Sequence, residues 1–203
     1  ADGVYTWTNV KPGTFAYQSG THPAVQVQMG LYGAMTKNSA DADLLTPALA
    51  EAYAGHAYDT EMTVLYSEID PVLHNQVANT VTPGAGNIGP YATTLAYGTT
   101  GMTSTMEYNP QYFLVNGDDS STGTPIAGAP GETSLIRFIN MGLTSHMPTL
   151  HGDDFAVIAE DGYAYTNPRN QYSVLVAANQ TRDVLFTPTS SGDYPLFDRA
   201  LNL

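Results

Sequence analysis

The sequence predicts an all-β protein built as a Greek-key β-sandwich, with one complete domain plus a partial one. Short runs rich in β-branched and aromatic residues recur along the chain, and clusters of turn residues separate them. No regular series of helices lies between these runs, which argues against a parallel α/β sheet. The first runs are too few to close a sandwich, so the opening segment is predicted to be part of a domain.

Residues 1–39 are expected to be the C-terminal part of a first domain, with short strands at 4–8, 14–17 and 30–35. Three strands leave open edges and half a core, which is costly and prone to aggregation. The segment therefore needs partner strands, either from other domains of the same protein or from neighbouring copies.

Residues 40–60 are predicted to be a linker with a short helix. The linker is rich in Ala and Leu, and Thr46 is a candidate N-cap before Pro47 at the first helical position. Residues 61–203 form the predicted second domain, and the stretch from 80 to 105 is expected to be a long loop or a surface hairpin. Its strands are expected at 62–66, 111–115, 133–139, 155–159, 171–176 and 182–186.

Composition limits the partners and the compartment. Six Lys and Arg against nineteen Asp and Glu give a formal charge of −13, which opposes binding to phosphate backbones, so nucleic acid is not expected as a partner. Neutral polar residues supply most of the solubility, which suits a secreted protein in a periplasmic or extracellular compartment. No apolar run is long enough for a membrane span. The absence of Cys excludes disulfides and thiolate metal sites.

Several runs resemble the multicopper oxidase family. Residues 12–22 (PGTFAYQSGTH) and 26–34 (QVQMGLYGA) are similar to the end of its first cupredoxin domain. The resemblance to the second domain of its bacterial branch rests on residues 65–71 (LYSEIDP), 112–117 (YFLVNG), 136–142 (IRFINMG) and 194–199 (YPLFDR). It covers nearly the whole chain, and it implies a cupredoxin-like fold and a position in the middle of a longer protein.

The resemblance implies copper as the cofactor of the family. Members oxidise substrate at a type 1 copper, held by two His and one Cys, and reduce O2 at a three-copper cluster held by imidazoles. This chain has five His and no Cys, so it cannot hold a full copper set by itself. Copper binding by this chain alone is therefore doubtful.

Three histidines are the candidate metal ligands. His22 precedes the Gln-X-X-Met-Gly-Leu run, where the family places a His-X-His pair; the alternative is a polar loop histidine. His146 and His151 resemble a copper-binding run of the family's third domain; the alternative is a hydrogen-bonded turn or a domain-interface pair. His74, just after Glu68-Ile69-Asp70, could be a histidine oriented for acid–base work, but a strand-end ion pair also explains these residues.

The first functional hypothesis is a fragment or subunit of a multicopper-oxidase-like protein, which contributes a scaffold domain to copper-dependent oxidation with O2 as acceptor. The alternative is a copper-free, cupredoxin-like extracellular assembly or filament subunit, completed by strands from a neighbouring chain. A third hypothesis is a copper carrier that uses the three candidate histidines. No hydrolase, phosphate-binding or dinucleotide motif occurs, and no catalytic residue is assigned.

Overall fold

The computed structural model describes residues 4, 6–41, 49–80, 105–119 and 125–199. Strands dominate this part of the chain, and the two helices in it are α1 (Pro23–Gln26) and α2 (Pro71–Thr80). The architecture is the predicted all-β sandwich. Neither described helix is long and apolar enough to cross a membrane.

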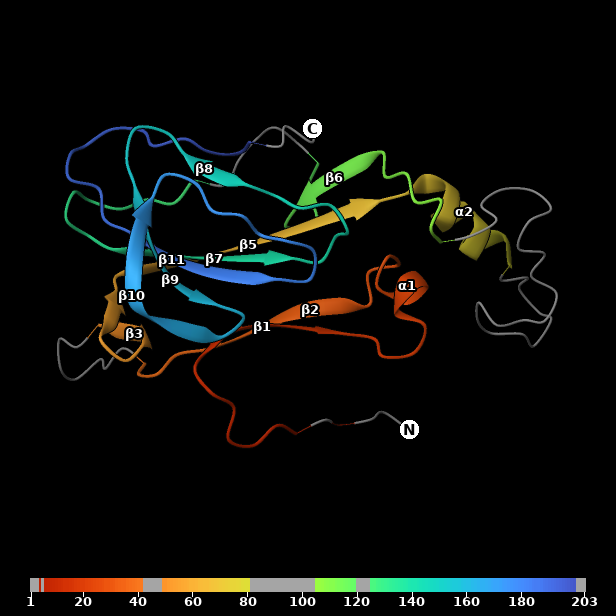
Figure 1. Cartoon of the computed structure of the whole chain (residues 1–203), viewed down its shortest axis with the longest axis horizontal. Coiled ribbons are helices and arrows are strands. Elements are labelled where there is room, and N and C mark those ends of the chain that lie inside the picture. The colour runs from red at the N-terminus through yellow and green to blue at the C-terminus, as the bar shows by residue number, and fades with distance from the viewer. Residues whose placement is uncertain (1–3, 5, 42–48, 81–104, 120–124, 200–203) are drawn as a thin grey trace.

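A six-stranded sheet is the frame of the molecule (Figure 1). Its strands lie in the order β10-β9-β11-β7-β5-β6, and neighbours are antiparallel except for the parallel pair β5 and β7. All seven residues of β7 are buried, so both faces of the sheet are covered at its middle. The bounds are β5 (Thr60–Ile69), β6 (Tyr112–Val115), β7 (Ser134–Asn140), β9 (Phe155–Glu160), β10 (Tyr163–Gln171) and β11 (Thr181–Phe186).

The inner face of this sheet packs against a smaller second layer. In that layer β8 (Pro148–Leu150) pairs with β12 (Leu196–Asp198), and isolated bridges add residues 173–176. Apolar side chains from both layers fill the space between them, with Phe138 on one side and Leu150 on the other. This cluster is the core of the sandwich.

The outer face is covered by the N-terminal part of the chain. Two hairpins lie there, β1 (Gly13–Gln18) with β2 (Tyr32–Lys37) and β3 (Ala50–Tyr53) with β4 (His56–Tyr58). Figure 1 shows β1, β2 and β3 on the opposite side of the large sheet from β8. We call the described residues 13–41 and 49–58 the N-terminal cover.

Successive residues of β7 divide between the two faces, because side chains alternate along a strand. Ile136 and Phe138 belong to the sandwich core. Leu135 packs with residues of β3 and β4, and Ile139 packs with Val27 of the cover. The cover is thus part of the same packed body as the sandwich.

A two-residue turn at Asp161-Gly162 joins β9 to β10. Both residues have positive φ, 48° and 73°, as a tight hairpin turn of this kind requires. A Cβ on Gly162 would collide with the ring of Phe15 in β1. Glycine therefore serves the turn and also lets β1 approach the large sheet.

The predicted strands agree with the structure in most places. Five of the second-domain predictions fall on β5, β6, β7, β9 and β11, and the predictions at 14–17 and 30–35 fall on or overlap β1 and β2. Residues 171–176 differ, because beyond residue 171 they form only isolated bridges. The described residues of 4–8 lie in no strand and are exposed, which differs from the predicted strand.

The linker also differs from the prediction. From residue 50 onward it is the hairpin of β3 and β4, where alternation of small and aromatic residues decides the structure. The candidate cap at Thr46 and Pro47 lies outside the described residues, as does nearly all of the stretch from 80 to 105.

Candidate functional site

His146 lies in the sandwich, beside the C-terminal strand β12. Its side chain is 3% exposed, and its Nδ1 is 2.7 Å from Oδ2 of Asp198. Its ring stacks on Tyr66, with ring centres 4.3 Å apart. Nε2 is buried without a hydrogen-bond partner in the described structure. With Nδ1 bound to Asp198, only Nε2 of the ring lacks a partner, which fits a packed core histidine.

His22 and His151 are both exposed, in contrast to His146. His22 is the N-cap residue of α1, with a left-handed φ of 53°, and His151 follows β8. The extended strand β8 lies between His146 and His151 and keeps their backbones apart. Among the described residues, no group of three or more His, Cys, Asp or Glu could hold a metal. The three candidates are therefore not gathered into one site.

An open depression of about 590 Å³ adjoins His151. Its wall includes Asp153 and Asp154 from the turn after β8 and Tyr172 from the end of β10. The depression is acidic, and it lies at the surface away from His146 of the core.

A buried polar network joins the N-terminal cover to the large sheet. Arg137 of β7 is fully buried, and its Nε donates to Glu61 at 2.6 Å. Its Nη1 donates to Thr14 Oγ1 at 2.9 Å, and its Nη2 donates to Asn38 at 2.8 Å. Thr14 in turn donates to Asp183 of β11 at 2.5 Å. Each guanidinium nitrogen thus has a partner, and two of the three partners belong to the cover.

The cover also contributes Tyr53, whose hydroxyl donates to Asp183 Oδ2 at 2.5 Å. Burial raises the pKa of the Asp183 carboxyl, and the hydroxyls of Thr14 and Tyr53 and the charge of Arg137 lower it. Burial, and next the Asp183 charge, raise the pKa of Tyr53, so its phenol stays neutral. Removing one charged partner of such a network leaves the other charge buried without compensation.

Two buried carboxylates mark the end of β5. Glu68 accepts hydrogen bonds from the backbone N–H of Thr144 and from its hydroxyl, both at 2.7 Å. Asp70 accepts from the N–H of Val72 at 2.8 Å, as an N-cap of α2, and from the N–H of Asn109 at 2.9 Å. The interpretation of these residues as a strand-end ion pair is wrong, because backbone donors satisfy both of them.

The helix that follows is signalled in the sequence, since Asp70 stands before Pro71 in an N-cap pattern. His74 lies on this helix, with its Nε2 3.0 Å from the carbonyl oxygen of Gln28. Tyr108 donates to the side chain of the same Gln28 at 2.7 Å. His74 and Tyr108 therefore hold a second part of the N-terminal cover.

The residues present do not fit the copper sites that the fold implies. A blue copper site needs a Cys thiolate, and the chain has no Cys. A three-copper cluster needs gathered imidazoles, whereas one candidate histidine is buried against Asp198 and the other two are exposed. The buried Arg137 network instead joins the cover to the sheet.

The family model described as "Multicopper oxidase" matches residues 90–202. A curated relative, "Putative laccase-17" of Oryza sativa subsp. japonica, is 42% identical over 72 residues, which are 34% of this chain and 12% of that protein. The chain thus spans a small part of that relative's length.

Solved structures share the fold. The blue copper oxidase from Nitrosomonas europaea matches with a TM-score of 0.67 and 16% identity, over 98% of this chain and 52% of that chain. The copper nitrite reductase from Nitrosomonas europaea matches with a TM-score of 0.65 and 19% identity, over 97% and 60%. At these identities the likeness concerns the cupredoxin-like fold, and the chain spans about half the length of the first of these proteins.

Proposed function

Because this chain belongs to the multicopper oxidase family, we propose that it is the scaffold portion of a larger protein that carries out copper-dependent oxidation with O2 as acceptor. The copper sites would be held by residues that this chain does not contain. The observation that carries the proposal is the Arg137 network, which fixes the N-terminal cover to the sandwich in a chain without Cys. A scaffold of this kind needs a rigid body and no metal ligands of its own.

The partners in this proposal are other cupredoxin domains, of the same protein or of neighbouring copies. Support comes from the β1-β2 hairpin, which is a two-stranded sheet by itself. Tyr17 and Leu31 of this hairpin region are 55% and 53% exposed, as expected where further strands pack. The composition supports an exported location, periplasmic or extracellular.

Copper loading tests the proposal. The purified chain is incubated anaerobically with Cu(I) and aerobically with Cu(II), desalted, and analysed for metal, visible absorbance and oxygen uptake with a one-electron reductant. We expect the chain to bind no more copper than a His22→Ala/His151→Ala variant binds. We also expect no blue absorbance band and no oxygen uptake. One copper per chain that the variant loses would instead support the predicted ligands. Oxygen uptake by the chain alone would refute the scaffold role.

A second candidate is a copper-free assembly subunit in which strands of a neighbouring chain complete the first sandwich. The lone β1-β2 sheet favours it, because unpaired strand edges accept donated strands. Hydrogen exchange of the β1 and β2 amides in dilute and concentrated samples tests it. Concentration-dependent protection of amides that do not bond within the hairpin is expected, and unchanged exchange would refute this candidate.

A further inference from the structure

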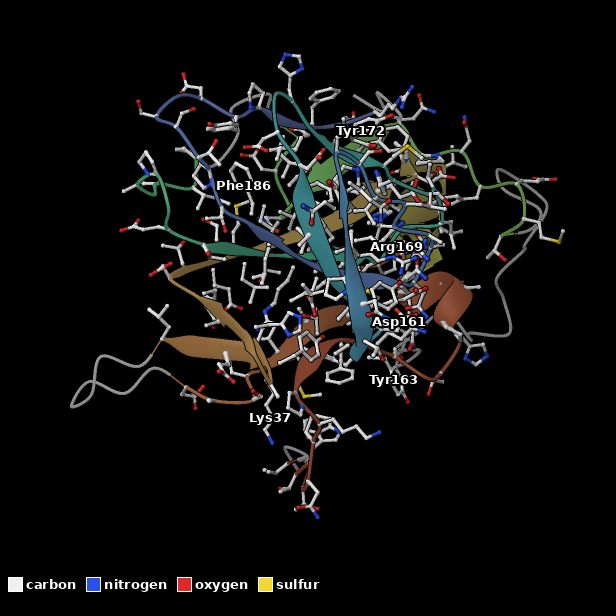
Figure 2. The ribbon with its side chains drawn as sticks, turned by 60° about the vertical axis from the view of Figure 1, so that its left-hand side comes forward. Lys37, Asp161, Tyr163, Arg169, Tyr172 and Phe186 are labelled. Carbon is white, nitrogen blue, oxygen red and sulfur yellow. The ribbon has the colours of Figure 1, made fainter. Side chains whose placement is uncertain are left out.

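Strand β10 presents exposed tyrosines at one edge of the large sheet. All nine residues of β10 are exposed, and the strand stands at the end of the sheet order. Tyr163, at its start, is 67% exposed, and Tyr172, which follows its last residue, is 54% exposed. Figure 2 shows Tyr163, Arg169 and Tyr172 in this order along the strand. We call residues 163–172 the β10 strip.

The strip combines aromatic rings with polar amides. Between residues 163 and 172 there is no Leu, Ile, Val, Met or Phe, so the tyrosines are the large apolar groups of the strip. The centre of a protein–protein interface is usually richer in apolar side chains. Asn167, Asn170 and Gln171 are exposed, and each of these amides carries donors and an acceptor. The strip therefore suits a ligand that has both ring faces and many hydroxyl groups.

Two of the tyrosines lie together at the start of the strip. Tyr163 is opposite Glu160 in the ladder of β10 and β9, and Tyr165 donates to Glu160 at 2.5 Å. Arg182 donates to the Tyr165 hydroxyl at 2.7 Å, and the Lys11 ammonium lies 5.2 Å from the ring centre of Tyr163. These contacts hold both rings in place, so less conformational entropy is lost when a ligand stacks on them.

The other end of the strip adjoins the open depression. Tyr172 forms part of its wall, together with His151, Asp153 and Asp154. Its volume of about 590 Å³ is within the range of small-molecule sites. The carboxylates can accept hydrogen bonds from hydroxyl groups, and Arg199, whose Nη1 donates to the Tyr172 hydroxyl at 3.4 Å, is a donor. Polar groups of both kinds therefore surround the exposed ring of Tyr172.

Positive and negative charges balance along the strip, although the whole chain has a formal charge of −13. Four cations and four carboxylates lie on it or at its ends. They are Lys11, Arg169, Arg182 and Arg199, and Glu160, Asp161, Asp153 and Asp154. A strongly charged partner of either sign would meet as many like as opposite charges, which is unfavourable. The balance therefore favours an uncharged ligand.

The backbone of this edge is poorly suited to accept another strand. Its pairing with β9 is irregular between Ala164 and Arg169, and Pro168 lacks an N–H donor. Bulges and prolines of this kind protect edges against strand addition. A ligand is therefore recognised through the side chains of the strip.

We propose that the β10 strip binds a neutral polysaccharide. The C–H groups on the face of a pyranose ring carry partial positive charge, and they pack on the negative face of an aromatic ring. Sugar rings stack on Tyr163 and Tyr172, and their hydroxyls bond to the amides between these two residues. The depression receives a ring at the end of the strip. This binding depends neither on copper nor on the proposed scaffold role.

Affinity electrophoresis of the 203-residue chain tests the proposal. Native gels are cast with hydroxyethyl cellulose, laminarin, galactomannan or dextran, which are uncharged polysaccharides, and mobility is compared with that in a gel without polymer. We expect retardation by at least one of the four. Retardation by none of them, or by the anionic polymers heparin and polygalacturonate alone, would overturn the proposal.

Tyrosine variants test which groups carry the binding. Tyr163→Ala and Tyr172→Ala should each weaken it by about tenfold, because each removes an aromatic face, whereas Tyr163→Trp keeps a face and should retain it. Tyr112→Ala is the matched control, because Tyr112 is 49% exposed on β6 at the opposite edge of the sheet. Urea unfolding verifies that each variant remains folded. Full retardation of both alanine variants of the strip, or an equal loss in Tyr112→Ala, would refute the assignment to β10.

Discussion

The two faces of the six-stranded sheet bind their partners by different means. The inner face meets the second layer through an apolar cluster around Phe138, which is fully buried. The outer face meets the N-terminal cover through smaller apolar clusters and through the Arg137 network. The same strand, β7, supplies both, because its side chains alternate between the faces.

The two faces therefore contribute differently to the stability of the fold and to the placement of the N-terminal cover. Apolar burial is non-directional, whereas each charge and donor of a buried network needs a specific partner. We therefore attribute the fold mainly to the inner face and the placement of the cover mainly to the outer face.

The largest effect is expected from Phe138→Ala on the inner face. Truncation of a fully buried aromatic residue removes packing and leaves a cavity, at a cost of about 4 kcal/mol. Urea unfolding followed by circular dichroism measures this loss. Exchange protection should fall in the large sheet and in the cover together, and a loss confined to one of them would contradict a shared body.

Asp183→Ala on the outer face should cost about 3 kcal/mol, because Arg137 and the Tyr53 hydroxyl lose a buried partner. In contrast to the inner variant, its effect should concentrate on β1 and β3. Residue-resolved hydrogen exchange distinguishes the two cases. Equal loss across the molecule would show that the network does not specifically hold the cover.

Gly162→Ala tests how much the close packing of β1 on the large sheet contributes to stability. It adds strain at a φ of 73° and a collision with the Phe15 ring, for about 2 to 3 kcal/mol in total. Gly117→Ala is a matched control, because its φ is 82° with no atom within 4 Å of the added carbon. The control should cost about 1 kcal/mol in urea unfolding. An equal loss of unfolding free energy at the two positions would show that the Phe15 contact does not contribute to the cost of Gly162→Ala.

The smallest effect is expected from Glu160, as a dependence of the unfolding free energy on acid pH. The Tyr165 hydroxyl and then Arg182 lower the pKa of Glu160 from its ordinary value of 4.5. A carboxylate whose pKa is lower in the folded state stabilises the fold at pH values above its ordinary pKa. This stabilisation is lost as the pH falls through the lowered pKa of the folded state. The stability difference between wild type and Glu160→Gln should therefore shrink from pH 6 to pH 3 in urea unfolding. A difference that stays constant with pH would contradict this.

Much of the inner face could be predicted from the sequence. Runs such as 133–139 and 155–159 carry the apolar and β-branched residues that mark buried strands. The family likeness and the cupredoxin-like sandwich are confirmed by the comparisons. These features depend on local patterns, which a sequence displays directly.

The outer face and the edges could be predicted less well. The network pairs Thr14 with Asp183 across 169 positions, and no local pattern links them. β10 is wholly exposed and polar, so it lacks the alternation that predicts a strand, although its Asp161-Gly162 turn was a usable signal. The three candidate histidines were chosen because their sequence runs resemble family motifs, but the tertiary structure decides whether they lie together, and in the described structure they do not.

The central claim is that the N-terminal cover and the sandwich form one rigid scaffold. Hydrogen exchange of the unmodified chain is the most direct test of this claim. We predict that the amides shared by β1 and β2 open with a free energy close to that of β7 and β11, since the Arg137 network and the packed clusters couple them. Exchange of β1 and β2 at the rate of an unfolded peptide, while β7 and β11 stay protected, would contradict the account.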